Sequence, residues 1–158
     1  MTKIATLCLL IKDKEITLAK KKKKVGAGKY NGYGGKVENN MSIEETAVKE
    51  VFQETGGVII KLENLEKVGV CYFFIDNEPV WFVHIFIARV WAGEPKETEE
   101  MGPPEKFNVD NIPYHEMLSG DQKWIPLILK GMKIRAVISY DKNNKLTFFS
   151  YSKTESIS

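Results

Sequence analysis

The sequence predicts a mixed α+β fold in which a β-sheet is sandwiched between helices, and three observations support this. Short apolar runs rich in β-branched and aromatic residues recur along the chain, as expected for strands. A helical pattern lies between Ser42 and Gly56, and a second, short apolar helix is expected at residues 124–130. The 158 residues contain no internal repeat and no linker, so we expect one domain covering residues 1–158.

The N-terminal part is predicted to form a hairpin followed by a glycine-rich segment. Residues 4–11 and 15–19 are apolar strand patterns, separated by a polar turn at 12–14. Residues 20–28 form a basic, flexible connection that begins with five consecutive lysines. Residues 30–37 are rich in glycine and are expected to be extended.

The helix between Ser42 and Gly56 has clear start and stop signals. Ser42 followed by Glu45 is the signature of a capping box. Gly56 is the residue type that commonly ends a helix, because glycine adopts a left-handed backbone without steric cost. The apolar residues between them recur at helical spacing and predict a core-facing stripe, made of Ile43, Ala47, Val48, Val51 and Phe52.

The rest of the chain alternates strand patterns with polar connections. Strands are expected at residues 58–62, 66–75, 80–91, 134–140 and 146–151. Turns are expected at 76–79 and 141–144. The proline-containing segment 93–106 is expected to be a loop, and the tail 152–158 is expected to be frayed.

Composition favours a cytoplasmic protein that needs neither a membrane nor an obligate nucleic acid partner. The net charge is +2, and no apolar run is long enough to span a bilayer. The run at 4–11 leads directly into charged residues and is interpreted as a core strand rather than a signal peptide. Cys8 and Cys71 lie in apolar strand patterns, which favours buried free thiols in a reducing compartment.

Two carboxylates on the predicted helix are the first candidates for chemistry. Glu50 and Glu54 are four residues apart, so they share a helix face and can converge on one point. A few oxygen ligands that leave room for water and phosphate suit Mg²⁺. The pattern therefore predicts a metal-dependent site for a phosphorylated substrate.

Residues 35–57 resemble the Nudix box, G-x5-E-x7-R-E-U-x-E-E-x-G-U, where U is a bulky aliphatic residue. The residues that match in register are Gly35, Glu50, Val51, Glu54 and Gly56. The departures are Met41 and Gln53 in place of glutamates, Lys49 in place of the arginine and Gly57 in place of the last aliphatic residue. The resemblance implies the Nudix fold and hydrolase activity.

Segments outside the box are similar to MutT-type Nudix hydrolases that act on oxidised purine nucleoside triphosphates. They occur in the shared order at 29–37, 83–86, 99–101, 111–114 and 123–127. The resemblance implies that a purine nucleoside triphosphate, ordinary or oxidised, such as 8-oxo-dGTP, is converted to monophosphate and pyrophosphate in nucleotide-pool sanitation. It also implies Mg²⁺ as the cofactor, with Mn²⁺ as a substitute, and we expect a monomer.

The resemblance assigns roles to individual residues. The implied metal ligands are the carbonyl of Gly34 and the side chains of Glu50, Gln53, Glu54 and Glu100. The implied catalytic residues are Glu50, Glu54 and Glu100, with either Glu50 or Glu100 as the general base. The implied substrate-binding residues are Thr6, Leu7, Lys21, Asn31, Phe73, Trp81 and Asp121.

Departures from the family pattern affect both the metal and the base. Gln53 offers an acceptor oxygen without charge, so further metal ions would be held more weakly. Gly120 replaces one of two adjacent aspartates, and Leu118 replaces a tryptophan that stacks on the base. Loss of such stacking removes ~1–3 kcal/mol per base. A purine is still expected to be bound through Asn31 and Asp121.

Two other functions fit the same residues. The chain could be a Nudix hydrolase of a dinucleoside polyphosphate or of another nucleoside diphosphate derivative. It could also be a catalytically weakened module that binds nucleotide or RNA, given Gln53, Lys49 and the lysines at 20–24. Those lysines are otherwise a solvated loop near an anionic substrate. His84, in an apolar strand pattern, is interpreted as a hydrogen-bonded core histidine rather than a base.

Overall fold

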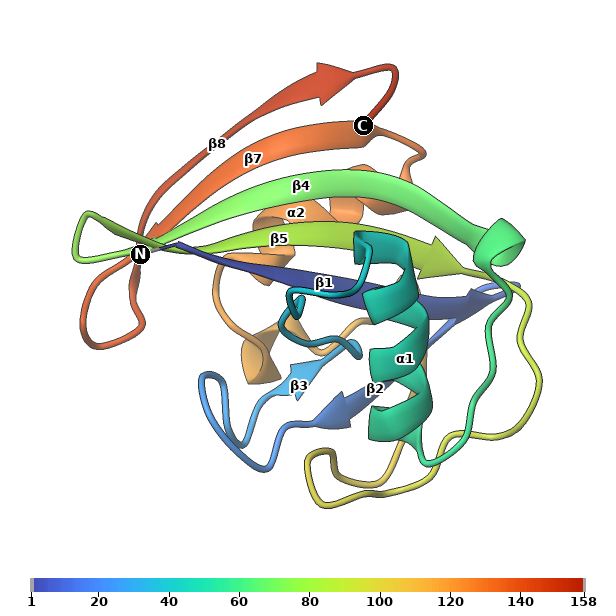
Figure 1. Cartoon of the computed structure of the whole chain (residues 1–158). Helices are drawn as coiled ribbons and strands as arrows, with labels where there is room; N and C mark the ends of the chain where they lie inside the picture. The colour runs from blue at the N-terminus through green and yellow to red at the C-terminus, as the bar shows by residue number, and fades with distance from the viewer. Residues whose placement is uncertain (1, 158) are drawn as a thin grey trace.

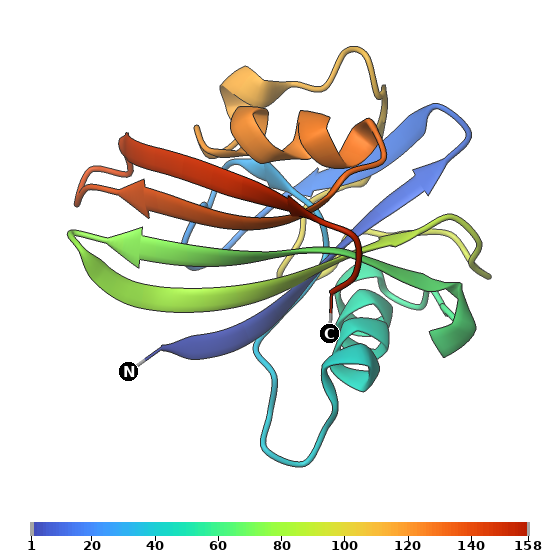
Figure 2. The ribbon, with the colours of Figure 1, turned by 90° about the horizontal axis from the view of Figure 1, so that it is seen from above.

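The computed structural model describes residues 2–157 and shows, within them, one eight-stranded sheet and two α-helices (Figure 1). The elements, with η for a 3-10 helix, are β1 Lys3–Lys12, β2 Glu15–Lys20, β3 Tyr30–Asn31, α1 Ile43–Thr55, η1 Leu62–Asn64, β4 Leu65–Ile75, β5 Glu78–Ala88, β6 Glu105–Asn108, η2 Tyr114–Glu116, α2 Asp121–Leu129, β7 Lys133–Tyr140 and β8 Leu146–Thr154. The strand order is β3-β2-β1-β5-β4-β7-β8, and β6 pairs with β2. Helices α1 and α2 cover opposite faces of this sheet, which is the predicted arrangement (Figure 2).

The strand β1 is at the centre of the fold. It forms the predicted antiparallel hairpin with β2 and pairs in parallel with β5 on its other side. Its residues Leu9, Leu10 and Ile11 are all buried, because helices cover both faces of the sheet here. Each face has its own apolar cluster, and Trp124 of α2 belongs to one of them.

Helix α1 begins and ends as predicted. The Ser42 Oγ accepts the backbone N–H of Glu45 at 3.1 Å, and the Glu45 carboxylate accepts the backbone N–H of Ser42 at 3.3 Å. Gly56 follows the helix with φ 73°, in the left-handed region. These contacts join residues a few positions apart, so both ends of the helix can be predicted from one short segment.

The predicted apolar stripe of α1 is only partly correct. Ala47 and Val51 are buried, but Phe52 is 49% exposed. The helix buries Glu54 and Thr55 on its inner side instead. The carboxylate of Glu54 has a hydrogen-bond donor inside the protein, the backbone N–H of Gly34.

Several predicted boundaries are wrong. Residues 58–62 are not a strand: within them only Ile59 forms a bridge, to Ala92, just after the end of β5. The predicted loop 93–106 ends at β6, because these residues pair with β2. This pairing joins segments that are far apart in the chain, so the local sequence does not predict it. Strand β8 runs to Thr154, into the tail expected to be frayed, because it pairs with β7 along that length.

Smaller differences concern turns and buried polar groups. The turn between β4 and β5 consists of Asp76 and Asn77, both with positive φ, so it is shorter than the predicted 76–79. Cys8 and Cys71 are buried and free. His84 is 5% exposed, and burial lowers its pKa to about 4, as expected for a neutral core histidine. Its Nδ1 has no hydrogen-bond partner within residues 2–157, so the predicted hydrogen bond is not found at that atom. Within residues 2–157, neither helix has the length and apolar character needed to cross a membrane.

Candidate active site

One cavity of about 590 Å³ brings the predicted site residues together. It lies between the glycine-rich segment, α1, the loop before β6, and the end of the sheet next to α2. Its lining includes every residue assigned a role from the sequence: Thr6, Leu7, Lys21, Asn31, Gly34, Glu50, Gln53, Glu54, Phe73, Trp81, Glu100 and Asp121. A cavity of this volume is in the usual range for small-molecule sites.

The glycine-rich segment forms one wall because it pairs with β1. The N–H of Thr6 donates to the carbonyl of Gly35 at 2.9 Å, and Cys8 and Tyr33 exchange backbone hydrogen bonds. A Cβ atom at Gly34 would overlap the carbonyl oxygen of Thr6, and a Cβ at Gly35 would overlap the carboxylate of Glu50. Glycine is therefore required at position 34 for the chain to approach β1 this closely, while a side chain at position 35 would displace the Glu50 carboxylate.

Glu54 is the most buried of the three glutamates at this end of the cavity. It is 8% exposed, and its Oε1 accepts the backbone N–H of Gly34 at 3.0 Å. Burial raises its pKa to about 8, a hydrogen bond with Glu100 adds to the increase, and the Gly34 N–H opposes it. Burial also raises the pKa of Glu50, which the neighbouring Lys49 opposes and Glu100 increases further. Glu50, Glu54 and Glu100 thus lie at one end of the cavity, the acidic end, and Glu100 raises the pKa of the other two.

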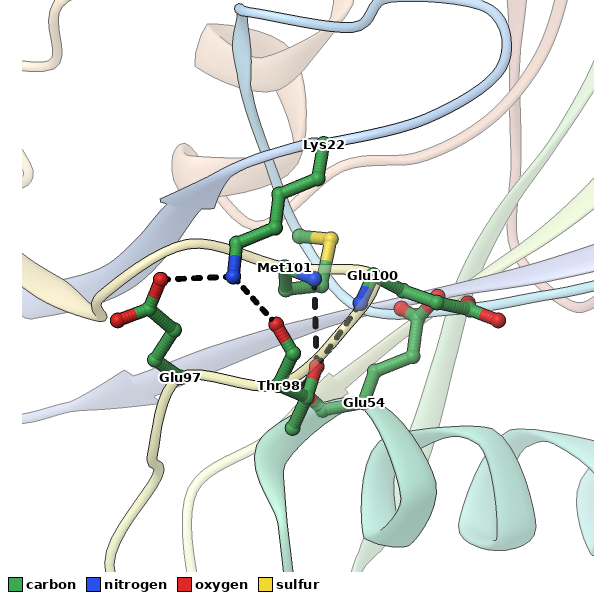
Figure 3. A network of polar contacts seen from close by, with 6 residues as sticks. All are labelled: Lys22, Glu54, Glu97, Thr98, Glu100 and Met101. Carbon is green, nitrogen blue, oxygen red and sulfur yellow. Dashed lines mark hydrogen bonds and ion pairs between the residues drawn. The ribbon is translucent and has the colours of Figure 1, made fainter.

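The loop that carries Glu100 is fastened to α1 through Thr98 (Figure 3). The Thr98 hydroxyl donates to the carbonyl of Glu54 at 3.1 Å and accepts the N–H groups of Glu100 and Met101 at 3.4 and 3.2 Å. The Nζ of Lys22 donates to the carbonyl of Thr98 at 2.7 Å. Sequence analysis missed Thr98 and Lys22, since these contacts join residues far apart in the chain.

The acidic end has the donor chemistry of a hard divalent cation. Its carboxylate and backbone carbonyl oxygens are the ligand types that Mg²⁺ prefers. Within residues 2–157, however, no three acidic, histidine or cysteine side chains are gathered closely enough to hold an ion. Glu50 lies against Gly35, while Glu54 accepts a hydrogen bond from Gly34 and the nearby Glu100 raises its pKa. A cation would compete for these oxygens. Gln53 is exposed at the cavity edge.

The opposite end of the cavity is apolar with a few polar groups. Asp121 is buried, its Oδ1 accepts the indole N–H of Trp124 at 3.0 Å, and burial raises its pKa to about 7. The Oδ1 of Asn31 accepts the N–H of Gly32 at 2.8 Å, so its amide N–H donors remain available. The apolar walls of this end, the base end, consist of Leu7, Phe73, Trp81, Val83 and Leu118.

Lysines surround the acidic end. Lys21 lines the cavity, where burial lowers its pKa and the charges of Glu54 and Glu100 oppose that shift. The other lysines in the lining are Lys23, Lys24, Lys36 and Lys49, and also Lys3, which lies over the ring of Trp81. Acidic and basic groups together at one end of a partly apolar cavity suit a ligand that is anionic at one end and uncharged at the other.

Comparison with known proteins agrees with this arrangement. Residues 1–128 match the family described as NUDIX domain. The oxidized purine nucleoside triphosphate hydrolases of Danio rerio and Mus musculus are 33% and 34% identical to the chain, over 99% and 98% of its length and 98% and 96% of theirs. The crystal structure of the mutator MutT protein from Bacillus halodurans superimposes with a TM-score of 0.79 at 26% identity, covering 95% of this chain and 97% of that one.

The family match covers most of the chain, and both relatives match over nearly their whole length. The eight-stranded mixed sheet between two helices has the same fold as the MutT structure. The chain therefore belongs to the Nudix family of hydrolases.

Proposed function

We propose that the chain hydrolyses a purine nucleoside triphosphate, including oxidised forms such as 8-oxo-dGTP, to the monophosphate and pyrophosphate. The observation that carries the proposal is that the acidic end and the Asn31–Asp121 end belong to one cavity. The printed names of the two animal relatives support the same substrate class. The biological role would be removal of damaged nucleotides from the precursor pool.

The two ends of the cavity divide the work. Asn31 and Asp121 offer hydrogen bonds to a base, and Phe73 and Trp81 pack around it. Lys21 offsets the charge of the phosphates. Binding of the base thus fixes the position of the triphosphate relative to the carboxylates, so the reacting groups are oriented before the reaction.

A divalent metal is the cofactor of the family, and we propose Mg²⁺, with Mn²⁺ able to substitute. Glu50, Glu54, Glu100 and the Gly34 carbonyl would hold it, with Gln53 as an uncharged partner. When bound, such a metal neutralises phosphate charge and orients the attacking water. Glu50 or Glu100 would accept the proton of that water.

The test is a panel of ordinary and oxidised purine nucleoside triphosphates, assayed with Mg²⁺ and with the products identified. Pyrophosphate and a nucleoside monophosphate from a purine substrate would support the proposal. Hydrolysis of only dinucleoside polyphosphates or nucleoside diphosphate derivatives, with no turnover of purine nucleoside triphosphates, would instead assign another Nudix activity. Nucleotide or RNA binding without turnover in Mg²⁺ or Mn²⁺ would reject it in favour of a binding module.

We also propose that the protein acts as a monomer in the cytoplasm. Every residue given a role belongs to a single chain, so no second copy is needed to complete the cavity. The buried free thiols of Cys8 and Cys71 suit a reducing compartment. Sedimentation at assay concentration checks the first point, and cell fractionation checks the second.

A further inference from the structure

Tyr140 forms a fixed part of the base end of the cavity. It is the last residue of β7, and its carbonyl accepts the N–H of Asp76 at 3.0 Å. Its ring lies parallel to that of Phe73, with centroids 6.5 Å apart, and the residue is 5% exposed. Both rings line the cavity together with Asp121. Backbone and ring are therefore held in place before any ligand arrives.

The Tyr140 hydroxyl has an unused donor. Its oxygen accepts the backbone N–H of Gly120 at 3.0 Å, which leaves its own O–H free to donate. Within the part of the chain that the structure describes, residues 2–157, no hydrogen bond donated by this hydroxyl is formed. Because a buried donor without an acceptor is unfavourable, a ligand atom in the cavity is the natural partner.

Gly120 and Tyr140 are sterically matched. A Cβ atom at Gly120 would lie 2.5 Å from the Tyr140 Oη and 2.9 Å from the Ile138 Cγ2. A side chain at position 120 and the hydroxyl at position 140 thus exclude each other. The polar group next to Asp121 in this chain is the tyrosine hydroxyl, where the family pattern has a second carboxyl group.

The two neighbouring groups also differ in protonation. Burial raises the pKa of Tyr140, so its hydroxyl stays protonated and remains a donor throughout the physiological range. Asp121, with a pKa of about 7, changes between donor and acceptor in that range. The base end therefore presents one constant donor beside one switchable group.

We propose that Tyr140 determines base specificity by donating a hydrogen bond from its hydroxyl to an acceptor atom on the edge of the bound base, beside Asp121. The acceptor is a carbonyl oxygen or a ring nitrogen, so bases with such an atom on this edge are favoured. The inference rests on the proposed function, because it takes a nucleobase as the occupant of this end.

The test compares binding of guanosine monophosphate with that of the benzimidazole riboside monophosphate, by calorimetry without metal. Benzimidazole keeps the fused-ring shape but lacks the polar edge of the six-membered ring. Tyr140→Phe should reduce the affinity ratio of the two ligands about tenfold, corresponding to ~1.4 kcal/mol. Because both affinities are measured on the same protein sample, their ratio does not depend on the fraction of folded protein.

The matched control is Tyr72→Phe. Tyr72 lies one residue before Phe73 on β4, so it points to the opposite face, where it stacks on Phe82. This control should leave the ratio unchanged. An unchanged ratio in Tyr140→Phe, or equal binding of both ligands by the wild-type protein, would overturn the inference. The readout needs no hydrolysis, so an absence of pyrophosphate release would reject the proposed function separately.

Discussion

The two ends of the cavity are built in different ways. At the acidic end, Gly34, Glu50 and Glu54 come from one continuous segment, a glycine-rich stretch and the helix that follows it. At the base end, Asn31, Phe73, Asp121 and Tyr140 come from four separate elements. Only Glu100 joins the acidic end from a distant loop, whereas the base end depends throughout on contacts between segments that are far apart in the chain.

Both ends hold a buried carboxyl group, but for different reasons. The pKa of Glu54 is raised by burial and then by the neighbouring Glu100. The pKa of Asp121 is raised by burial alone, and hydrogen bonds from Trp124 and the Leu118 backbone oppose the shift. Crowded carboxyl groups suit cation binding, while a single carboxyl group suits recognition of a neutral base.

The largest effect that separates the two ends is expected for Glu54→Gln. Gln keeps the shape and can accept the Gly34 N–H, but it has no charge to offer a cation. We expect turnover to fall about 10²–10³-fold, while the preference among bases stays the same. Steady-state assays on two purine substrates measure both quantities. Wild-type turnover in this variant would remove Glu54 from the reaction, and a thermal melt confirms that the variant is folded.

Asp121→Asn tests the buried carboxyl group of the base end through the pH dependence of stability. The folded protein keeps the Asp121 proton up to about pH 7, whereas the unfolded chain loses it near the ordinary value of 3.8. Between these values the folded state binds more protons, so Asp121 makes stability fall as pH rises, by up to ~1.4 kcal/mol per pH unit. Above about pH 7 its contribution is constant.

Asn does not titrate, so the variant should lack this decline. Urea unfolding of both proteins from pH 4 to pH 8 gives the difference curve, in which contributions from Glu54 and His84 cancel. If the free energy of unfolding depends on pH in the same way in both proteins, the raised pKa of Asp121 is contradicted. The preference among bases should also weaken in this variant, and an equal loss on all substrates would argue against contact with the base.

A smaller effect is expected for Thr98→Val, which tests whether the acidic end depends on its neighbouring loop. Val keeps the shape of Thr98 but removes the hydroxyl that joins the Glu54 carbonyl to the N–H of Glu100. We expect turnover to fall about tenfold, the equivalent of one hydrogen bond of ~1.4 kcal/mol. Thr98→Ser should restore it.

The matched control for this variant is Thr147→Val. Thr147 donates its hydroxyl to the carbonyl of Ser139 at 3.2 Å in the exposed hairpin of β7 and β8. Removal of this hydroxyl should leave turnover intact. If both valine variants lose activity equally, the loop does not position Glu100.

The smallest effect is expected for Gln53→Glu. Gln53 is exposed at the cavity edge, so an added carboxylate there should lower the Mg²⁺ concentration for half-maximal activity by only ~3-fold, through added ligand charge. A Mg²⁺ titration of activity measures this, with Gln122→Glu on α2 as a control of equal charge. An identical titration for Gln53→Glu and the wild-type protein would refute a metal-related role for this position.

The sequence predicted the acidic end well because its determinants are local. Ser42, Glu45 and Gly56 define α1 through contacts a few residues apart, and the spacing of Glu50 and Glu54 places both on the cavity side. The apolar stripe was predicted less well. Phe52 fits the helical period but is exposed, since the buried side of α1 is set by what it meets in the folded protein.

The base end shows the limit of a prediction from sequence. The loss of an aspartate at Gly120 can be read from the chain, but its consequence cannot. Only the structure places the hydroxyl of Tyr140, 20 residues further on, where a side chain at position 120 would lie. Likewise, residues 58–62 have a strand pattern, but in the folded protein they form only the single bridge between Ile59 and Ala92.

By itself, the sequence determined the α+β class, the capped helix with its two carboxylates, and the glycines in front of it. Hydrogen bonds and periodicities within a short segment are sufficient for these. The tertiary structure alone decided that Thr98 fastens the Glu100 loop to α1 and that Tyr140 lies beside Asp121. Such contacts join distant segments, and they exist only once the whole sheet has formed and fixed the distances between its strands.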